Sequence, residues 1–267
     1  MIFNMIASST PLLLCALGAL FSEYAGILAM FIDGLLNFSA FLFYFFTLTT
    51  GSPIAASALT IASITAAVLI LAFIIEKTKA NPFVAGLGMN LFFTSLTSLI
   101  SSLYFKTRGV LYSPAFQFNP RNVSIISIIV TILLTLAAIY FLKYTQKGIY
   151  LRITGSDSHV LEAKGVHASI YRISSWVISS GFTAVAGIFL CAKISSFVPN
   201  ISSGRGWMAL AAVFLGRKKI WKISLFTLIF CAADIFSTNI QNFIPSIPSS
   251  ILLSFPYLIA IILSCLK

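Results

Sequence analysis

The run IAASALTIASITAAVLILAFII, at residues 54–75, decides the fold class of this chain. It contains no charged residue. A helix that crosses the hydrocarbon core of a bilayer needs about 20 mostly apolar residues. The run is long enough to meet that requirement, and it therefore predicts a membrane-spanning helix rather than a buried helix of a soluble protein.

Apolar runs of similar length lie on both sides of this one, at residues 2–21, 25–49, 83–105, 123–142, 173–192, 223–241 and 247–266. Residues 207–216 are equally apolar, but the segment is too short for an ordinary span and suggests a half-helix or a broken element. The sequence therefore predicts an all-α fold, a polytopic transmembrane helical bundle of about eight spans plus a short broken or re-entrant helix. We expect residues 1–267 to form a single transmembrane domain.

Composition supports a membrane protein. Hydrophobic residues make up 59 % of the chain and charged residues only 9 %, with a mean hydropathy of +1.02. A soluble domain carries roughly 25 % charged residues. A soluble enzyme, a disordered protein and a nucleic-acid-binding domain are therefore poor interpretations of this chain.

The net charge of +11 is distributed in short basic tracts between the apolar runs. Lys and Arg are enriched in cytoplasmic loops of membrane proteins. Twelve of the 17 basic residues fall on one side when loops 76–82, 143–172 and 217–222 and the C-terminal Lys267 are placed together, and five fall in loops 106–122 and 193–206. We therefore expect a multi-pass protein of the cytoplasmic (inner) membrane, with loop 143–172 inside and a helix-compatible stretch at 157–167.

Catalytic signatures are missing from the sequence. It has no GxxxxGK[ST] phosphate loop and no HExxH. Its two histidines, His159 and His167, lie in one loop with no nearby cysteine. We expect no catalytic residue, no metal site and no cofactor in this chain.

Polar residues inside the predicted spans are the first candidate functional residues. Asp33 and Asp234 are acids at membrane depth, where an ionisable group is costly unless it is paired or faces water. They could line a polar path, form a subunit interface or make helix-packing hydrogen bonds. The same alternatives hold for the uncharged polar residues of the spans, Asn37, Asn90, Thr94 and Thr97.

Five segments resemble one family, the integral membrane permease subunits of ABC importers for nucleosides, ribose-type sugars and branched-chain amino acids. Residues 204–217, GRGWMALAAVFLGR, are similar to its GRG-aromatic-x-ALAAVIFGR segment. Residues 148–155, GIYLRITG, continued by AKGV at 163–166, resemble its G-xxx-RAxGxN…A…AGI loop. The other matches are weaker singly but fall in the family's order, at residues 81–97, 23–34 and 233–234.

Departures from the family pattern bear on the substrate. Ala29 and Phe31 replace the Asn and Gly of the family's SERSGVVNIGLEG segment, and residues 155–158 read GSDS rather than GENP. The pattern is most similar to the nucleoside (guanosine-type) subgroup, with sugar and branched-chain amino-acid permeases left open.

The resemblance implies a non-enzymatic transport subunit that moves a small solute, a nucleoside or simple sugar, inward. ATP and Mg would bind to partner ATPase subunits that dock on the coupling loop, at Gly155, Asp157, Glu162, Ala163 and Gly165. A second permease subunit and an extracytoplasmic solute-binding protein would be further partners. The broken-helix motif would comprise Gly204, Arg205, Gly206 and Gly216.

The sequence leaves two rival functions open. An ion-coupled secondary transporter for a small polar solute would need paired acids and bases at membrane depth, and the sequence gives the membrane-depth acids no evident basic partner. A membrane scaffold or a membrane enzyme is the other alternative.

Overall fold

The computed structural model describes residues 2–243 and 249–265 and is helical throughout these ranges, apart from connecting loops and one isolated bridge between Leu111 and Phe197. The helices are α1 (Ile2–Tyr24), α2 (Ile32–Thr50), α3 (Pro53–Thr78), α4 (Pro82–Tyr104), α5 (Pro120–Tyr144), α6 (Gln146–Ser156), α7 (Ser158–Glu162), α8 (Ala168–Ile194), α9 (Arg205–Leu215), α10 (Ile220–Phe243) and α11 (Ser249–Cys265). The prediction of an all-α bundle is confirmed.

Seven of these helices are long and apolar enough to cross a membrane, namely α1, α2, α3, α4, α5, α8 and α10. The expected short element is present as α9, which has only 11 residues. The expected last span falls on α11, where Ser254–Leu263 is an apolar helix shorter than the seven candidate spans. These helices make the chain an integral membrane protein.

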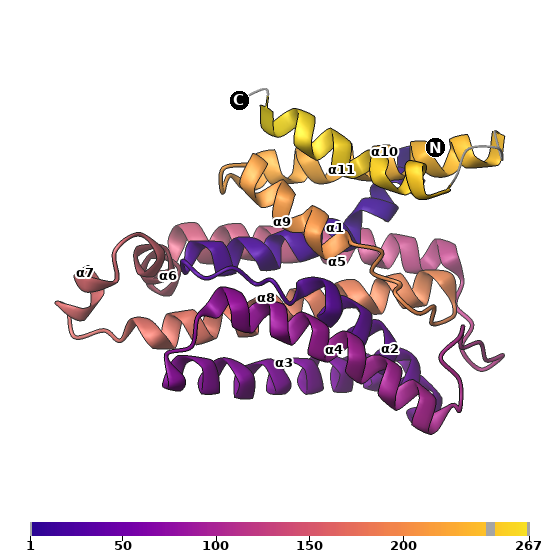
Figure 1. Cartoon of the computed structure of the whole chain (residues 1–267), viewed down its shortest axis with the longest axis horizontal. Helices are drawn as coiled ribbons and strands as arrows, with labels where there is room; N and C mark the ends of the chain where they lie inside the picture. Colours follow the sequence, from indigo (N-terminus) through magenta and orange to yellow (C-terminus); the bar gives the residue numbers. More distant parts are fainter. Residues whose placement is uncertain (1, 244–248, 266–267) are drawn as a thin grey trace.

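Helices α1, α2 and α8 form the centre of the bundle, and α3, α4 and α5 lie around them. Figure 1 shows α3 and α4 on one side of the bundle and α10 and α11 on the other. In the most apolar stretch of α1, 78 % of residues are buried, against 22 % in α3. Lipid tails are as apolar as leucine, so the outer helices can leave apolar side chains uncovered by protein.

The expected span at residues 25–49 was wrong at its start. The chain leaves the helical conformation after Tyr24, runs as a loop through residues 25–31, and begins α2 only at Ile32. Gly26 has a φ of +78°, a left-handed conformation that glycine adopts without strain. Asp33 and Gly34 lie in the first turn of α2.

Loop 143–172 also differs from expectation in its helical content. Its main helix is α6, which lies before residue 157, and only the five residues of α7 are helical within the stretch 157–167. Gly165, with a φ of +73°, prevents α7 from continuing into α8.

The predicted basic loops 76–82, 143–172 and 217–222 gather at one end of the bundle, whereas Lys267 lies outside the described residues. Glu76, at the end of α3, pairs with Arg172 in the first turns of α8, and Lys218, after α9, pairs with Glu23 at the end of α1. At the other end, Leu111 and Phe197 exchange backbone hydrogen bonds between loops 105–119 and 195–204. Helices α6 and α7 project at the basic end, on the left in Figure 1.

Candidate functional site

Helix α9 begins inside the bundle. Its 11 residues span about 16 Å at 1.5 Å per residue, which is about half of a 30 Å hydrocarbon core. It ends at Gly216, next to the basic tract 217–222 at the end of the bundle. The opposite end of α9, at Arg205 and Gly206, therefore lies near mid-depth.

The carboxylate of Asp33 joins the first turns of α2 and α9. It accepts a hydrogen bond from the backbone N–H of Gly206 at 3.0 Å and another from the hydroxyl of Ser202 at 3.1 Å. The N-terminal end of a helix carries unpaired N–H groups and a partial positive charge, which stabilise an anion. Asp33 thus holds two helix ends together.

Glycine at position 206 is required by this contact. A Cβ added there would lie 2.5 Å from the backbone nitrogen of Asp33 and 2.6 Å from its Cα, closer than real Cβ contacts occur. The backbones of α2 and α9 can approach this closely only because residue 206 has no side chain.

Two asparagines extend the network to other elements. Buried Asn37 accepts a hydrogen bond at 3.2 Å from the backbone N–H of Ile201, in the loop that leads to α9. Asn90, on α4, accepts one at 2.6 Å from the N–H of Gly34. Each side-chain oxygen accepts a hydrogen bond from a backbone N–H group that lipid could not pair.

The second acid has a basic partner. The guanidinium of Arg205 lies 3.2 Å from the carboxylate of Asp234 on α10, and it also donates to the carbonyl of Ile201 at 3.2 Å. The expectation that the membrane-depth acids lack basic partners was wrong for Asp234. The two residues are 29 positions apart, and their pairing depends on how α9 packs against α10.

We call this set of residues the mid-bundle network: Asp33, Asn37, Asn90, Ser202, Arg205, Gly206 and Asp234. Thr97 and Thr94 lie outside it. The Thr97 hydroxyl is buried and donates to its own helix at Phe93, whereas Thr94 is exposed and donates to the carbonyl of Asn90. The two threonines therefore differ in their surroundings, since one is buried and the other is exposed.

A second group of contacts lies at the basic end of the bundle, and we call it the end cluster: Glu23, Tyr24, Gly26, Arg152, Gly155 and Lys218. The Lys218 ammonium lies 3.1 Å from the Glu23 carboxylate, and the Tyr24 hydroxyl donates to the Lys218 carbonyl at 2.7 Å. The Arg152 guanidinium lies 5.6 Å from the centre of the Tyr24 ring, within cation–π range.

Helix α6 touches the α1–α2 loop by backbone alone at Gly155. A Cβ on Gly155 would lie 2.6 Å from the nitrogen of Gly26, so no larger residue fits. Recesses of about 530 and 450 Å³ flank this contact. Helix α6 therefore contacts the loop before α2 over a small area around Gly155, and a recess lies on each side of this contact.

The remaining residues expected in the coupling loop face away from the bundle. Asp157 caps α7 by accepting the N–H of His159 at 3.0 Å. Glu162, Ala163 and Gly165 are exposed, and nothing lies within 4 Å of a Cβ built on Gly165. Among the broken-helix residues, Gly204 precedes α9 with a φ of +76° and Gly216 ends the helix.

Several site residues were missed at the sequence level. Ser202 and Lys218 carried no signal of their own, because serines and basic loop residues are common in this chain. Tyr24 lay in the family-like segment at residues 23–34, but no role was predicted for it. Gly26 stood within the family-like segment at residues 23–34 and could have been singled out. No group of three or more His, Cys, Asp or Glu suited to a metal ion occurs among the described residues.

A bundle of spanning helices with a broken helix at mid-depth, joined by charged side chains, is the architecture of a membrane transport subunit. The family model described as "Branched-chain amino acid transport system / permease component" matches residues 1–263. The chain belongs to this family. It is the membrane-spanning permease subunit of an ABC importer and not an enzyme.

Individual relatives are distant but cover much of the chain. The chain is 25 % identical to the nucleoside ABC transporter permease protein NupC of Lactococcus lactis, over 98 % of this chain and 90 % of the relative. It is 24 % identical to the guanosine ABC transporter permease protein NupQ of Bacillus subtilis, over 78 % and 72 %. The solved structure of PsaBC from Streptococcus pneumoniae in complex with Fab has the same fold, with a TM-score of 0.57 and 15 % identity over 97 % of this chain and 88 % of that one.

Family membership also decides between the rival functions. The Arg205–Asp234 pair removes the argument that was made from the sequence against an ion-coupled transporter. The family match across the chain leaves the ABC permease as the function.

Proposed function

We propose that this permease carries a nucleoside, or failing that a simple sugar, inward across the cytoplasmic membrane. The names of two relatives, a nucleoside and a guanosine permease, support the nucleoside class. Uptake of a labelled nucleoside by cells that express the complete importer, with competition by unlabelled nucleosides and by ribose, tests the solute. Competition by ribose alone would move the assignment to sugars.

Loop 143–172 is the docking site of the ATPase in this proposal. One observation carries it: α6 and α7 project from the basic end of the bundle and leave Ala163 and Gly165 exposed, while Gly155 bears on the loop before α2. A push on α7 would pass through Gly155 and Gly26 to the start of α2, where Asp33 holds α9. Solute access would then change by a rigid shift of packed helices.

The partners follow from this mechanism. Cytoplasmic ABC ATPase subunits would bind ATP and Mg, this chain supplying no cofactor. A second permease subunit, the same or different, would complete the path, and an extracytoplasmic binding protein would deliver the solute. The mid-bundle network would then lie on the path or at the interface between the two permeases.

Ala163→Glu tests the docking site, because position 163 has helical backbone angles and is exposed, so the variant can fold. We expect loss of uptake and of solute-stimulated ATPase activity, with membrane insertion unchanged. The matched control is Ala115→Glu, at an exposed position in loop 105–119 at the opposite end. Normal uptake and ATPase stimulation in the Ala163 variant would overturn the assignment of loop 143–172 as the docking site.

A further inference from the structure

A pocket of about 760 Å³ opens between the end of α3, the start of α4 and the start of α8. It belongs neither to the mid-bundle network nor to the end cluster. Its wall combines two chemistries. One part is apolar, with Phe73, Ile75, Pro82 and Ile173, and the other is basic, with Lys77, Lys79 and Arg172.

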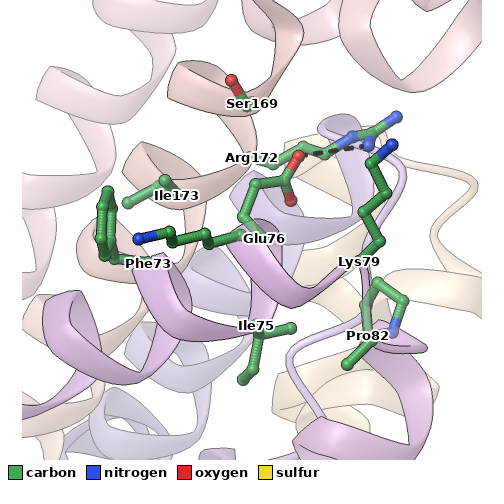
Figure 2. A pocket seen from close by; sticks show the side chains of 10 residues that line it. Phe73, Ile75, Glu76, Lys79, Pro82, Ser169, Arg172 and Ile173 are labelled. Carbon is green, nitrogen blue, oxygen red and sulfur yellow. Dashed lines mark hydrogen bonds and ion pairs between the residues drawn. The ribbon is translucent and has the colours of Figure 1, made fainter.

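The basic side chains of the lining carry more positive charge than its single carboxylate can neutralise. Glu76 is the one carboxylate among the lining residues, and it lies 3.4 Å from Arg172. The two lysines of the lining add two further positive charges. Figure 2 shows the Lys79 side chain extending toward the same part of the pocket as the Arg172 guanidinium. Like charges directed to one place repel, and an anion placed between them relieves that repulsion.

The apolar part is continuous with the outer surface of a spanning helix. Phe73 is 57 % exposed, and Leu69 and Ile70, one turn before it on α3, are 48 % and 61 % exposed. Helix α3 is among the least covered spans, so this face meets lipid tails unless a partner subunit covers it. The basic residues lie at its end, at the level of the headgroups.

We propose that this pocket binds an anionic phospholipid of the inner leaflet. The phosphate would lie between Lys79 and Arg172, with Lys77 adding positive charge elsewhere in the lining, and the acyl chains would run along α3 past Phe73. A basic pocket between spanning helices on the cytoplasmic side suits an anionic lipid headgroup. Because the lining comes from α3, α4 and α8, a bound lipid would tie the outer helices to the centre of the bundle.

Binding of phosphatidylglycerol to the full chain in zwitterionic detergent, counted by native mass spectrometry, tests the proposal. The pocket variant is Lys77→Gln/Lys79→Gln. The matched control, Lys219→Gln/Lys222→Gln, removes two charges at the same end of the bundle but outside the pocket. We expect the pocket variant to lower the affinity about 30-fold, from two near-surface cations, and the control to lower it less than threefold.

Three results would overturn the proposal. Equal losses in the two variants would mean a general attraction to the basic end. Binding of glycerol 3-phosphate as tight as that of the lipid would mean a site for a free anion, with no part for the apolar wall. Loss of bound lipid when the ATPase subunits are added would assign the pocket to subunit docking.

Discussion

Two ion pairs of nearly equal length lie in different surroundings. In the mid-bundle network, Arg205 and Asp234 are 3.2 Å apart, and in the end cluster Lys218 and Glu23 are 3.1 Å apart. Helix α9 separates them by about half a bilayer. At the end of the bundle, water can replace a lost partner, whereas at mid-depth lipid cannot. Breaking the ion pair should therefore cost more free energy of unfolding in the mid-bundle network than in the end cluster.

Both regions also contain a glycine at which two backbones meet, Gly206 with Asp33 and Gly155 with Gly26. The first contact joins two helices inside the bundle, and the second joins the bundle to a helix at its end. The first fixes how the spans pack, whereas the second is a single contact with a recess on each side. We therefore expect substitutions in the mid-bundle network to lower stability strongly. Substitutions in the end cluster should mainly affect the coupling of ATP hydrolysis to transport.

The largest effect should come from Gly206→Val. The new side chain would overlap the backbone of Asp33, so α9 or α2 must move, at a cost of about 3 kcal/mol or more. The measurement is the yield and thermal unfolding of the protein in detergent. Gly88→Val is the control, because nothing lies within 4 Å of a Cβ at that position. Equal stability of the two variants would contradict the claim that the contact between Gly206 and Asp33 fixes the packing of α2 and α9.

Arg205→Met should rank second. It leaves the Asp234 carboxylate without its cation at membrane depth, and we expect a loss of about 2–3 kcal/mol of unfolding free energy. Adding Asp234→Asn to this variant should restore most of the loss, because the unpaired charge is then gone. A double variant no more stable than the single one would show that the pair does not account for the effect.

Asp33→Leu should cost less, about 1–2 kcal/mol, because it removes a charge as well as an acceptor. It leaves the N–H of Gly206 unpaired, while the Ser202 hydroxyl can rotate toward Asn200, whose side-chain oxygen is 3.3 Å away. If α2 and α9 move as a unit during transport, uptake should be lost even though the protein still folds and inserts into the membrane. Unchanged uptake and assembly in this variant would remove Asp33 from both the path and the interface.

Glu23→Gln should give the smallest effect, at most about 1 kcal/mol, because the Lys218 side chain is 42 % exposed and its ammonium can be hydrated. The Lys218 carbonyl keeps its hydrogen bond from Tyr24, which holds the turn after α9 in place. The salt dependence of the unfolding temperature should decrease in this variant. A loss as large as that of Arg205→Met would contradict the assumed access of water to the end cluster.

The sequence predicted much of the fold and about half of the candidate site. Apolar runs gave the spans within a few residues, but the start of α2 was placed at residue 25 rather than Ile32, since the loop at 25–31 is itself apolar. Asp33, Asn37, Asn90 and Asp234 were chosen for their rarity in apolar segments, and all four make contacts between elements. The hydroxyl of Thr97 instead donates to the Phe93 carbonyl of its own helix.

The sequence by itself determined that this chain lies in a bilayer, which ends of its helices carry the basic residues, and which family it resembles. These properties depend on the length of apolar runs, the positions of charges and short motifs, all of which are local. Only the tertiary structure decided that Asp33 meets Gly206 and that Asp234 meets Arg205. Those contacts join segments 173 and 29 residues apart, and they depend on the rotation and depth of each helix, which close packing sets and hydropathy does not.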